Sequence, residues 1–302
     1  MPNNTVLSVD GIEVTLSNLE KVFYPTGFTK GEVIDYYIRI APALLPHIQD
    51  RPITLKRYPN GATGKFFYQK SCPKGKPPWV HTLPVWSEGR GENISYCLMD
   101  SLPALIWAAN MAALELHPSL SAAADISRPT VMVFDLDPGP PAAMTECAEV
   151  ALMLRAILDK YGLASYPKTS GSKGLQVYVP LHTPCTYEQT KDFSRLVATT
   201  LESHRPDLVV AKMKKTLRTG KVFIDWSQND EHKTTVSVYS LRAKDRPTPS
   251  APVSWQEVGA VYQGQNPRLI DFDCWGVLQR FEKYGDLFAP VLSVQQKLPY
   301  SS

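Results

Sequence analysis

Apolar and polar residues alternate near the start of the chain, and this pattern predicts a β-hairpin. In VLSVDGIEVTL (6–16) the apolar positions recur at every second residue on both sides of Asp10-Gly11, a frequent hairpin turn. Thr29 precedes Glu32 by three residues, the spacing of a helix capping box, and apolar residues follow at helical spacing. We therefore expect a helix to begin at about residue 30.

Short strands and helices are mixed through the next hundred residues. Residues 53 to about 79 are rich in Pro, Gly and Lys and predict strands joined by loops. SLPALIWAANMAALELH (101–117) has the apolar spacing of a helix, which we expect to end near His117. TVMVF (130–134) is a short apolar run, typical of a buried strand, that leads directly into Asp135.

The second half continues this mixture. Thr145 is expected to cap a helix that stops at Gly162, and Thr186 with Gln189 to cap another. The helices are too few for a doubly wound parallel sheet, so the pattern predicts an α/β (α+β) fold with mixed or antiparallel sheets. Three apolar segments predict further strands: LQVYVPL (175–181), KVFIDW (221–226) and TTVSVYSL (234–241).

We predict one domain over residues 1–302. An N-terminal part of about 1–120 packs against a catalytic part of about 128–302, with the boundary between 118 and 129. No internal repeat or low-complexity linker separates the two parts, so we expect them to share one site.

The composition is that of an ordinary globular protein, with 43% hydrophobic and 20% charged residues. No run of 18 apolar residues indicates a membrane span, and the start lacks the features of a secretory signal. These features predict a cytoplasmic, nucleoid-associated protein. Cys72 and His81 could form half of a zinc site, but no second pair has ligand spacing. The scattered cysteines favour reduced thiols over a disulfide framework; they are residues 72, 97, 147, 185 and 274.

The net charge of +3 is small, but basic residues are concentrated in two segments. KMKKTLRTGK (212–221) has five basic residues and no acidic one, and KFFYQKSCPKGKPPW (65–79) mixes lysines with aromatic rings. Basic residues neutralise phosphates and exposed rings stack on bases, so both segments are candidates for nucleic-acid binding. A solvated loop with a few core aromatics would look the same in sequence.

Two aspartates at the end of a predicted strand are the clearest candidate for catalytic chemistry. In VMVFDLDPG, Asp135 and Asp137 are two residues apart and therefore point to the same face. They repel each other unless a cation lies between them, and such oxygen ligands suit Mg²⁺ or Mn²⁺. Two solvated aspartates at a turn are the alternative.

A third aspartate ends another apolar strand. Asp225 follows Val222, Phe223 and Ile224 directly, and a carboxylate in such surroundings needs a partner. If it lies beside the first pair, the three carboxylates form the ligand set of two-metal phosphoryl transfer.

A short loop between these strands has the composition of an anion site. Ser170, Ser172 and Lys173 alternate with glycines in TSGSKG, so the backbone N–H groups could surround a phosphate. A plain hairpin turn is the alternative. Arg242, after the TTVSVYSL segment, could reach a phosphate or lie on the surface.

Together these segments resemble a known family. FDLDPG, TSGSKG, VFIDWSQN, KTT and YSLR, in this order, are similar to the polymerase domain of bacterial ligase D, a non-homologous end-joining protein, or to its stand-alone relatives. These belong to the archaeo-eukaryotic primase superfamily, which implies a primase-like catalytic core. The resemblance runs from NLEKVFYP through RPITLKRYPNG and ALELH to YSLRA.

The resemblance implies a role for each matching residue. Two divalent ions, Mn²⁺ or Mg²⁺, would be held by Asp135, Asp137 and Asp225. The implied nucleotide-binding residues are Lys56, His117, Ser170, Ser172, Lys173, Gln228 and Arg242. The implied DNA-binding residues are Phe66 and Phe67 at the template, Arg218 on a mobile basic loop, and Asn18, Lys21 and Lys30 around a downstream 5′-phosphate. Gln176 departs from the pattern, because many members have a histidine there that can carry a proton.

The favoured function is a template-directed nucleotidyltransferase, a DNA-repair polymerase that fills gaps and extends 3′ ends at breaks. It would use NTPs or dNTPs, with ribonucleotides favoured, on gapped, overhanging or broken DNA that has a 5′-phosphate. Ku and a DNA ligase are the protein partners that the resemblance implies. The alternatives are a primase-type de novo initiator, a non-catalytic DNA-end binding module and a metal-dependent nuclease.

Overall fold

The computed structural model describes residues 4–87 and 89–299, and the chain divides into two units. The first comprises Met1–Ser119, Thr234–Pro249 and Asp273–Gly285, and the second comprises Leu120–Lys233, Ser250–Phe272 and Asp286–Ser302. The division is therefore not a single cut near residue 120, because two later stretches return to the first unit. The prediction of one domain with a shared site stays a prediction.

The first unit begins with the two elements that the opening pattern predicts. Strands β1 (Asn4–Val9) and β2 (Ile12–Ser17) form an antiparallel hairpin, which confirms the first prediction. Helix α1 (Lys30–Ile48) begins at the expected capping box. The Thr29 hydroxyl accepts from the Glu32 N–H, and the Glu32 carboxylate accepts from the Thr29 N–H at 2.7 Å. This box fixes where the chain turns into the helix.

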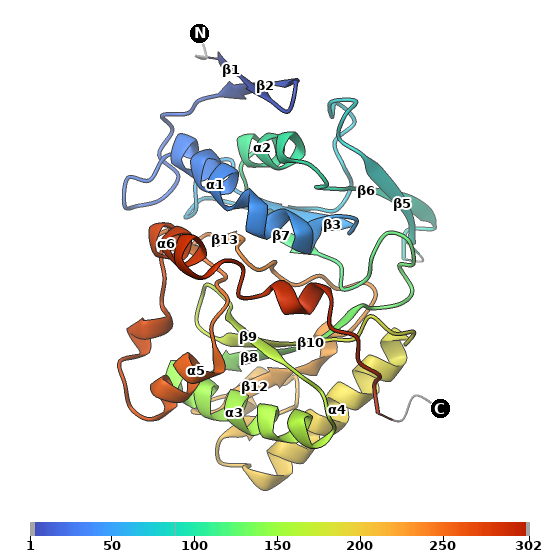
Figure 1. The fold of residues 1–302 in the computed structure, drawn as a ribbon, viewed down its shortest axis with the longest axis vertical. Coiled ribbons are helices and arrows are strands. Elements are labelled where there is room, and N and C mark those ends of the chain that lie inside the picture. The colour runs from blue at the N-terminus through green and yellow to red at the C-terminus, as the bar shows by residue number, and fades with distance from the viewer. Residues whose placement is uncertain (1–3, 88, 300–302) are drawn as a thin grey trace. The chain divides into compact units, whose positions relative to one another are not determined.

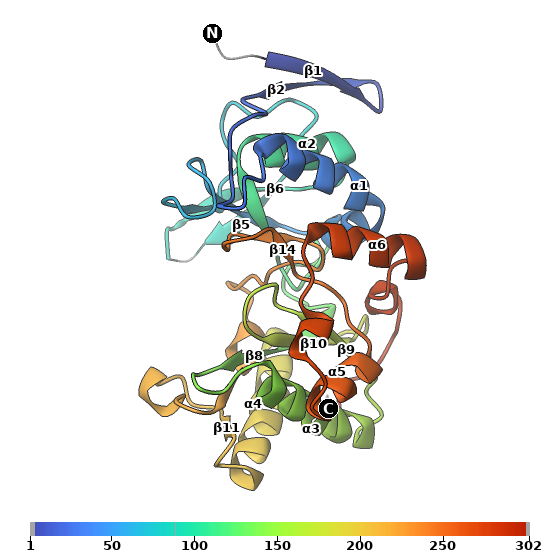
Figure 2. The ribbon, with the colours of Figure 1, turned by 90° about the vertical axis from the view of Figure 1, so that its left-hand side faces the viewer.

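An antiparallel sheet and two further helices complete the first unit. Helix α1 packs against α2 (Leu102–Asn110) and α6 (Cys274–Tyr284) (Figures 1 and 2). The strand order is β4-β3-β6-β5, with β7 also paired to β3. The strands are β3 (Ile53–Arg57), β4 (Phe67–Gln69), β5 (Thr82–Ser87), β6 (Glu92–Cys97) and β7 (Ala113–Pro118), and a short pair is formed by β13 (Leu241–Arg242) and β14 (Thr248–Pro249).

Two predictions in this unit are wrong. The helix expected over 101–117 ends at Asn110, where Ala112 adopts φ 64°, and the rest forms β7. Pairing of ALELHP with β3 decides its conformation, and helical spacing could not reveal that partner. The TTVSVYSL segment (234–241) is not a regular strand until its last residue. It is buried beside β7, where Ser237 N–H donates to the Leu116 carbonyl, and Tyr239 turns the backbone at φ 65°.

The expectation of reduced thiols is also wrong for two cysteines. Cys72 and Cys97 form a disulfide, with their Cα atoms 5.0 Å apart. Folding brings β6 beside the segment after β4, a proximity that the spacing of 25 residues does not indicate. The bond removes Cys72 from any zinc site, and His81 Nδ1 lies 2.7 Å from Asp100 instead. The remaining cysteines are buried and free: Cys147, Cys185 and Cys274.

The second unit is a five-stranded sheet with helices on one face. The strand order is β11-β12-β8-β10-β9; only β11 and β12 are parallel, and the other neighbours are antiparallel. Helices α3 (Met144–Lys160) and α4 (Tyr187–His204) cover one face of this sheet, and α5 (Trp255–Tyr262) packs against α3 (Figure 1). The mixed and antiparallel α/β class is confirmed. The strands are β8 (Val131–Pro138), β9 (Tyr166–Thr169), β10 (Leu175–Pro180), β11 (Val209–Val210) and β12 (Val222–Asp225).

The helices of this unit follow the predicted stripes, with one shifted start. Helix α3 (Met144–Lys160) begins after Ala143, whose N–H donates to the Glu146 carboxylate at 2.7 Å, so Thr145 is not its cap. Thr186 and Gln189 cap α4 as expected. The remaining helices are α4 (Tyr187–His204), α5 (Trp255–Tyr262) and the 3₁₀ turns η1 (Lys215–Leu217), η2 (Trp226–Gln228), η3 (Pro267–Ile270) and η4 (Ala289–Leu292). Within the described ranges, no helix is long and apolar enough to cross a membrane.

Candidate functional site

The sheet of the second unit aligns four polar side chains in one row. Strand pairing places Lys168 of β9 opposite Gln176 of β10, Gln176 opposite Asp135 of β8, and Asp135 opposite Asp225 of β12. Their neighbours along each strand, such as Phe134 and Leu136, pack into the helical core. The row therefore occupies the face that the helices do not cover.

The carboxylates in this row repel one another. Asp137 follows two residues after Asp135 on the same face, and Asp225 pairs with Asp135 across the strands. Burial and the negative charge of Asp137, with a smaller contribution from Asp225, raise the pKa of Asp135 to about 7. A cation among these oxygens would relieve both the repulsion and the burial of charge.

The chemistry of these donors suits a hard divalent cation. Asp225 Oδ1 accepts from the Ser227 hydroxyl at 2.6 Å and from the Ser227 N–H, and its Oδ2 accepts from the Gln228 amide at 2.8 Å. Oδ2 retains a second lone pair for another partner. Among residues 4–87 and 89–299, no three Asp, Glu, His or Cys side chains already stand as a complete metal-ligand set.

A buried lysine lies at the far end of the row. Lys168 is fully buried, and its ammonium donates to Gln176 Oε1 and to the Ser250 hydroxyl, both at 2.6 Å. Because Oε1 faces Lys168, the Gln176 amide N–H₂ group is the one that hydrogen-bonds Asp135. Gln176 is also buried. Gln176, which stands where many family members have a histidine, therefore links the buried Lys168 ammonium to the Asp135 carboxylate and is not exposed to solvent.

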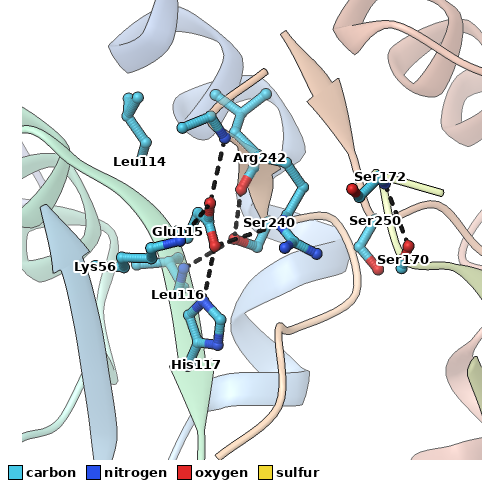
Figure 3. A network of polar contacts seen from close by, with 12 residues as sticks. Lys56, Leu114, Glu115, Leu116, His117, Ser170, Ser172, Ser240, Arg242 and Ser250 are labelled. Carbon is cyan, nitrogen blue, oxygen red and sulfur yellow. Dashed lines mark hydrogen bonds and ion pairs between the residues drawn. The ribbon is translucent and has the colours of Figure 1, made fainter. Parts of the chain in front are cut away.

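The TSGSKG loop lies beside the end of β8. A Cβ on Gly174 would come within 1.9 Å of the Leu136 carbonyl oxygen, so only glycine permits this approach. Ser170 Oγ accepts from the Ser172 N–H (Figure 3) and from the Gly174 N–H, each at 3.2 Å. Two of the N–H groups expected to form the anion site are thus satisfied within the loop. Ser172 and Lys173 are exposed at its tip.

The basic segment 212–221 packs against the other side of β8's end. The Arg218 guanidinium lies 3.6 Å from the centre of the Phe223 ring, and Phe223 is the residue opposite Asp137. Gly139 makes this packing possible, since a Cβ there would come within 2.0 Å of the Arg218 carbonyl oxygen. Arg218 is half-buried here, while Lys212 is exposed.

In the first unit, three predicted nucleotide-binding residues surround one carboxylate. Lys56 Nζ, His117 Nε2 and Arg242 Nε lie 3.5, 3.0 and 3.3 Å from the carboxylate oxygens of Glu115 (Figure 3). The residues come from β3, β7 and β13, and the β3–β7 register places Lys56 directly opposite Glu115. With His117 neutral, Lys56, Arg242 and Glu115 give this cluster a net charge of +1.

The two predicted template-stacking rings diverge. The Phe66 ring lies 4.3 Å from Lys56 Nζ and is 51% exposed. The Phe67 ring, 44% exposed, instead lies 5.1 Å from the guanidinium of Arg57. The rings of Tyr58 and Tyr68 also lie within 5.4 Å of Lys56 Nζ. Phe66 thus belongs to the Lys56 cluster, whereas Phe67 offers a separate exposed ring.

The predicted 5′-phosphate residues also come together. Lys30, the first residue of α1, is only 4% exposed, and its ammonium donates to the Ser17 carbonyl at 2.5 Å. Lys21 donates to the Pro59 carbonyl at 2.7 Å. Burial, together with the charge of Lys21, lowers the pKa of Lys30 to about 8. Asn18 is exposed in the adjoining turn, where its carbonyl accepts from the Lys21 N–H.

Sequence reasoning missed Glu115 and Lys168. Glu115 was included in a predicted helix, in which residues two positions apart, such as Glu115 and His117, do not face the same side. In a strand, the same two residues share a face. Lys168 lies in the short strand YPKT, and a lysine there is normally assigned to the surface. A charged residue inside an apolar segment was the available signal for Glu115.

The comparisons with known proteins all indicate the same family. A profile of the LigD primase-polymerase domain matches residues 29–288. The multifunctional non-homologous end joining protein LigD of Mycolicibacterium smegmatis is 42% identical over 281 residues, covering 92% of this chain and 36% of that protein. The bifunctional LigD of Bacillus subtilis is 32% identical over 292 residues, covering 96% and 46%. The chain thus spans less than half the length of these relatives.

A solved structure is similar over nearly the whole chain. The polymerase domain of Mycobacterium tuberculosis ligase D, in complex with DNA, superposes with a TM-score of 0.86 at 39% identity. The match covers 94% of this chain and 99% of that domain.

Proposed function

This chain belongs to the LigD primase-polymerase domain family, and on that premise we propose that it is a template-directed nucleotidyltransferase that fills gaps and extends 3′ ends at DNA breaks. The observation that carries the proposal is the pairing of Asp135 with Asp225 across β8 and β12, with Asp137 on the same face. Clustered carboxylates repel DNA by themselves, so a binding module would have no use for them.

Asp135, Asp137 and Asp225 would hold two divalent ions, Mn²⁺ or Mg²⁺. Bound there, the ions would lower the pKa of a primer 3′-hydroxyl and neutralise the triphosphate. Ser227 and Gln228 orient Asp225, while Gln176, held by Lys168, orients Asp135. These hydrogen bonds fix the orientation of the Asp225 and Asp135 carboxylates before a metal ion binds.

The remaining polar residues would hold the nucleotide. In the second unit, Ser170 closes the loop that presents Ser172 and Lys173 to a phosphate. In the first unit, the net positive cluster of Lys56, His117 and Arg242 suits an anionic group. Gln228 would act chiefly through Asp225, because its amide already donates there. Ribonucleotides would be used readily, with NTPs favoured over dNTPs.

DNA would be bound through exposed rings and cations. Phe66 and Phe67 would stack on bases, and Arg218, in the basic segment 212–221, would approach the primer end. Lys21 and Lys30, with Asn18 beside them, would bind a downstream 5′-phosphate. A buried ammonium next to a second one is unfavourable in the free protein, and a phosphate dianion would reverse that energy.

The biological setting follows from the relatives. Both LigD proteins compared are named for non-homologous end joining, so we propose the same pathway for this chain, with Ku and a DNA ligase as partners. The protein would act in the cytoplasm, at the nucleoid.

One assay tests the proposal. The protein is incubated with Mn²⁺ and a gapped primer–template that has a downstream 5′-phosphate, with NTPs and dNTPs in separate reactions. Templated extension, faster with NTPs, is expected. Cutting of the DNA would indicate a nuclease, and retardation without extension would indicate an end-binding module. Products formed without a primer would indicate a primase.

A further inference from the structure

Glu115 is the buried centre of the first unit's polar cluster. Its side chain is 2% exposed. Besides its hydrogen bonds with Lys56 and His117 and its ion pair with Arg242, it accepts from the Tyr58 hydroxyl at 2.9 Å. The Ala243 N–H also donates to it, at 3.3 Å. Figure 3 shows the carboxylate between the side chains of Lys56, His117 and Arg242. No role in nucleotide binding was expected for Glu115.

The carboxylate joins elements that are distant in the chain. Lys56 lies in β3, and Tyr58 directly follows that strand. His117 lies in β7 and Arg242 in β13. The cations of Lys56 and Arg242 repel each other when they are held close together. Long side chains also lose conformational entropy when they are held in one place. Glu115 supplies the opposing charge that lets Lys56 and Arg242 remain in one array.

The carboxylate stays ionised in this position. Burial alone would raise the pKa of Glu115, but the hydrogen bond from His117 and the charges of Arg242 and Lys56 hold that pKa well below its usual range. An ionised carboxylate only accepts hydrogen bonds, so His117 must carry its proton on Nε2. Within the described part of the chain, His117 Nδ1 has no hydrogen-bond partner, so this nitrogen is available to a ligand.

We propose that Glu115 is a positioning residue for the incoming nucleotide: it holds Lys56, His117 and Arg242 as one preorganised array without touching the nucleotide itself. The inference rests on the proposed function, since it concerns nucleotide binding by those three residues. Substitution of a residue that only stabilised the fold would change nucleotide affinity, DNA affinity and the melting temperature together. A positioning residue changes nucleotide binding selectively.

The test compares Glu115→Gln with the wild-type protein. Glutamine keeps the size and one acceptor, but it removes the charge and directs an N–H₂ group at cationic donors. We expect KM for the NTP to rise about tenfold or more, because hydrogen bonds to charged groups are lost. kcat and the affinity for gapped DNA should stay within about twofold. Glu92→Gln, an exposed glutamate of β6 in the same unit, is the matched control and should match wild type.

A double-mutant cycle separates positioning from general destabilisation. If Glu115 acts through Arg242, then Glu115→Gln combined with Arg242→Ala should raise KM little beyond Arg242→Ala alone, within about twofold. Additive effects would overturn the proposal, as would an unchanged KM or a loss confined to kcat. If Glu115→Gln fails to fold, Tyr58→Phe tests the same point, because it removes one hydrogen bond to Glu115 and keeps every charge and the ring. That variant should raise KM about threefold, and no rise would overturn the proposal.

The outcomes also separate this proposal from the proposed function. A wild-type protein that neither extends primers nor binds NTP would contradict the function itself. A wild-type protein that extends normally, together with an unaffected Glu115→Gln variant, would contradict only the role of Glu115.

Discussion

Asp225 of β12 lies directly opposite Asp135 of β8 in an antiparallel strand pair. Side chains opposite each other in such a pair project to the same face at close range. Two acids therefore meet on the face of the sheet opposite its helices, although long segments of chain separate them in sequence. Their arrangement does not stabilise the fold, because like charges directly opposite each other destabilise a sheet.

Removing any carboxylate of this group should abolish primer extension. Asp135→Asn, Asp137→Asn and Asp225→Asn each delete a negative charge that would hold a metal ion, and the extension rate should fall about a hundredfold or more. Affinity for gapped DNA should be unchanged or higher, since less negative charge faces the phosphates. Asp159→Asn, an exposed residue of α3, serves as control. A variant that retains more than about a tenth of the wild-type rate would exclude its aspartate from the metal group.

A downstream 5′-phosphate should tighten binding to gapped DNA. Direct contact between a phosphate and the ammonium groups of Lys21 and Lys30 should strengthen binding about tenfold over the same DNA with a 5′-hydroxyl. The Lys21→Ala/Lys30→Ala double variant should bind both DNAs equally. Fluorescence anisotropy at modest salt measures the four affinities. Equal binding of the two DNAs by the wild-type protein would remove the site.

The same preference should weaken at alkaline pH. Burial and the neighbouring Lys21 lower the pKa of Lys30 to about 8. Below that pH Lys30 carries the positive charge that attracts phosphate. Above it, Lys30 is mostly neutral and must take up a proton before it can attract phosphate. The preference for 5′-phosphate should therefore fall about tenfold between pH 7 and pH 9. Lys30→Arg, which stays charged throughout this range, should abolish this change, and a wild-type preference that is constant to pH 9 would show that Lys30 does not contribute.

Breaking the polar row should destabilise the second unit. Gln176→Leu leaves the Lys168 ammonium and the Asp135 carboxylate without their shared partner in a buried position. The free energy of unfolding should fall by roughly 2–3 kcal/mol, as expected when charged groups lose buried hydrogen bonds. Urea unfolding followed by circular dichroism measures it. Gln265→Leu, at an exposed position, should change it by less than about 0.5 kcal/mol. Equal effects of the two substitutions would mean that the row contributes little.

Local patterns were sufficient for much of the fold. The Asp10-Gly11 hairpin and the capping boxes at Thr29 and Thr186 depend on residues within a few positions of one another, and all three form as predicted. The alternation in VMVFDLDPG likewise placed Asp135 and Asp137 on one face before any partner strand was known. These features follow from backbone geometry and short-range hydrogen bonds, which the sequence encodes directly.

Long-range pairing decided the remainder. The segment 113–118 has helical apolar spacing but becomes a strand, because β3 supplies the backbone donors and acceptors with which it pairs. The Cys72–Cys97 bond, the burial of Lys30 and the different neighbours of Phe66 and Phe67 depend in the same way on which segments meet in space.

The candidate site shows the same division. Sequence identified Lys56 and His117 only through family resemblance, and Arg242 as a residue that could either reach a phosphate or lie on the surface. It did not identify Glu115, the carboxylate that contacts all three. The sequence by itself determined which residues carry charge and, where it predicted a strand, which face of that strand each occupies. Tertiary structure alone decided which charges meet, because the energy of a buried charge depends on partners that the fold brings from distant parts of the chain.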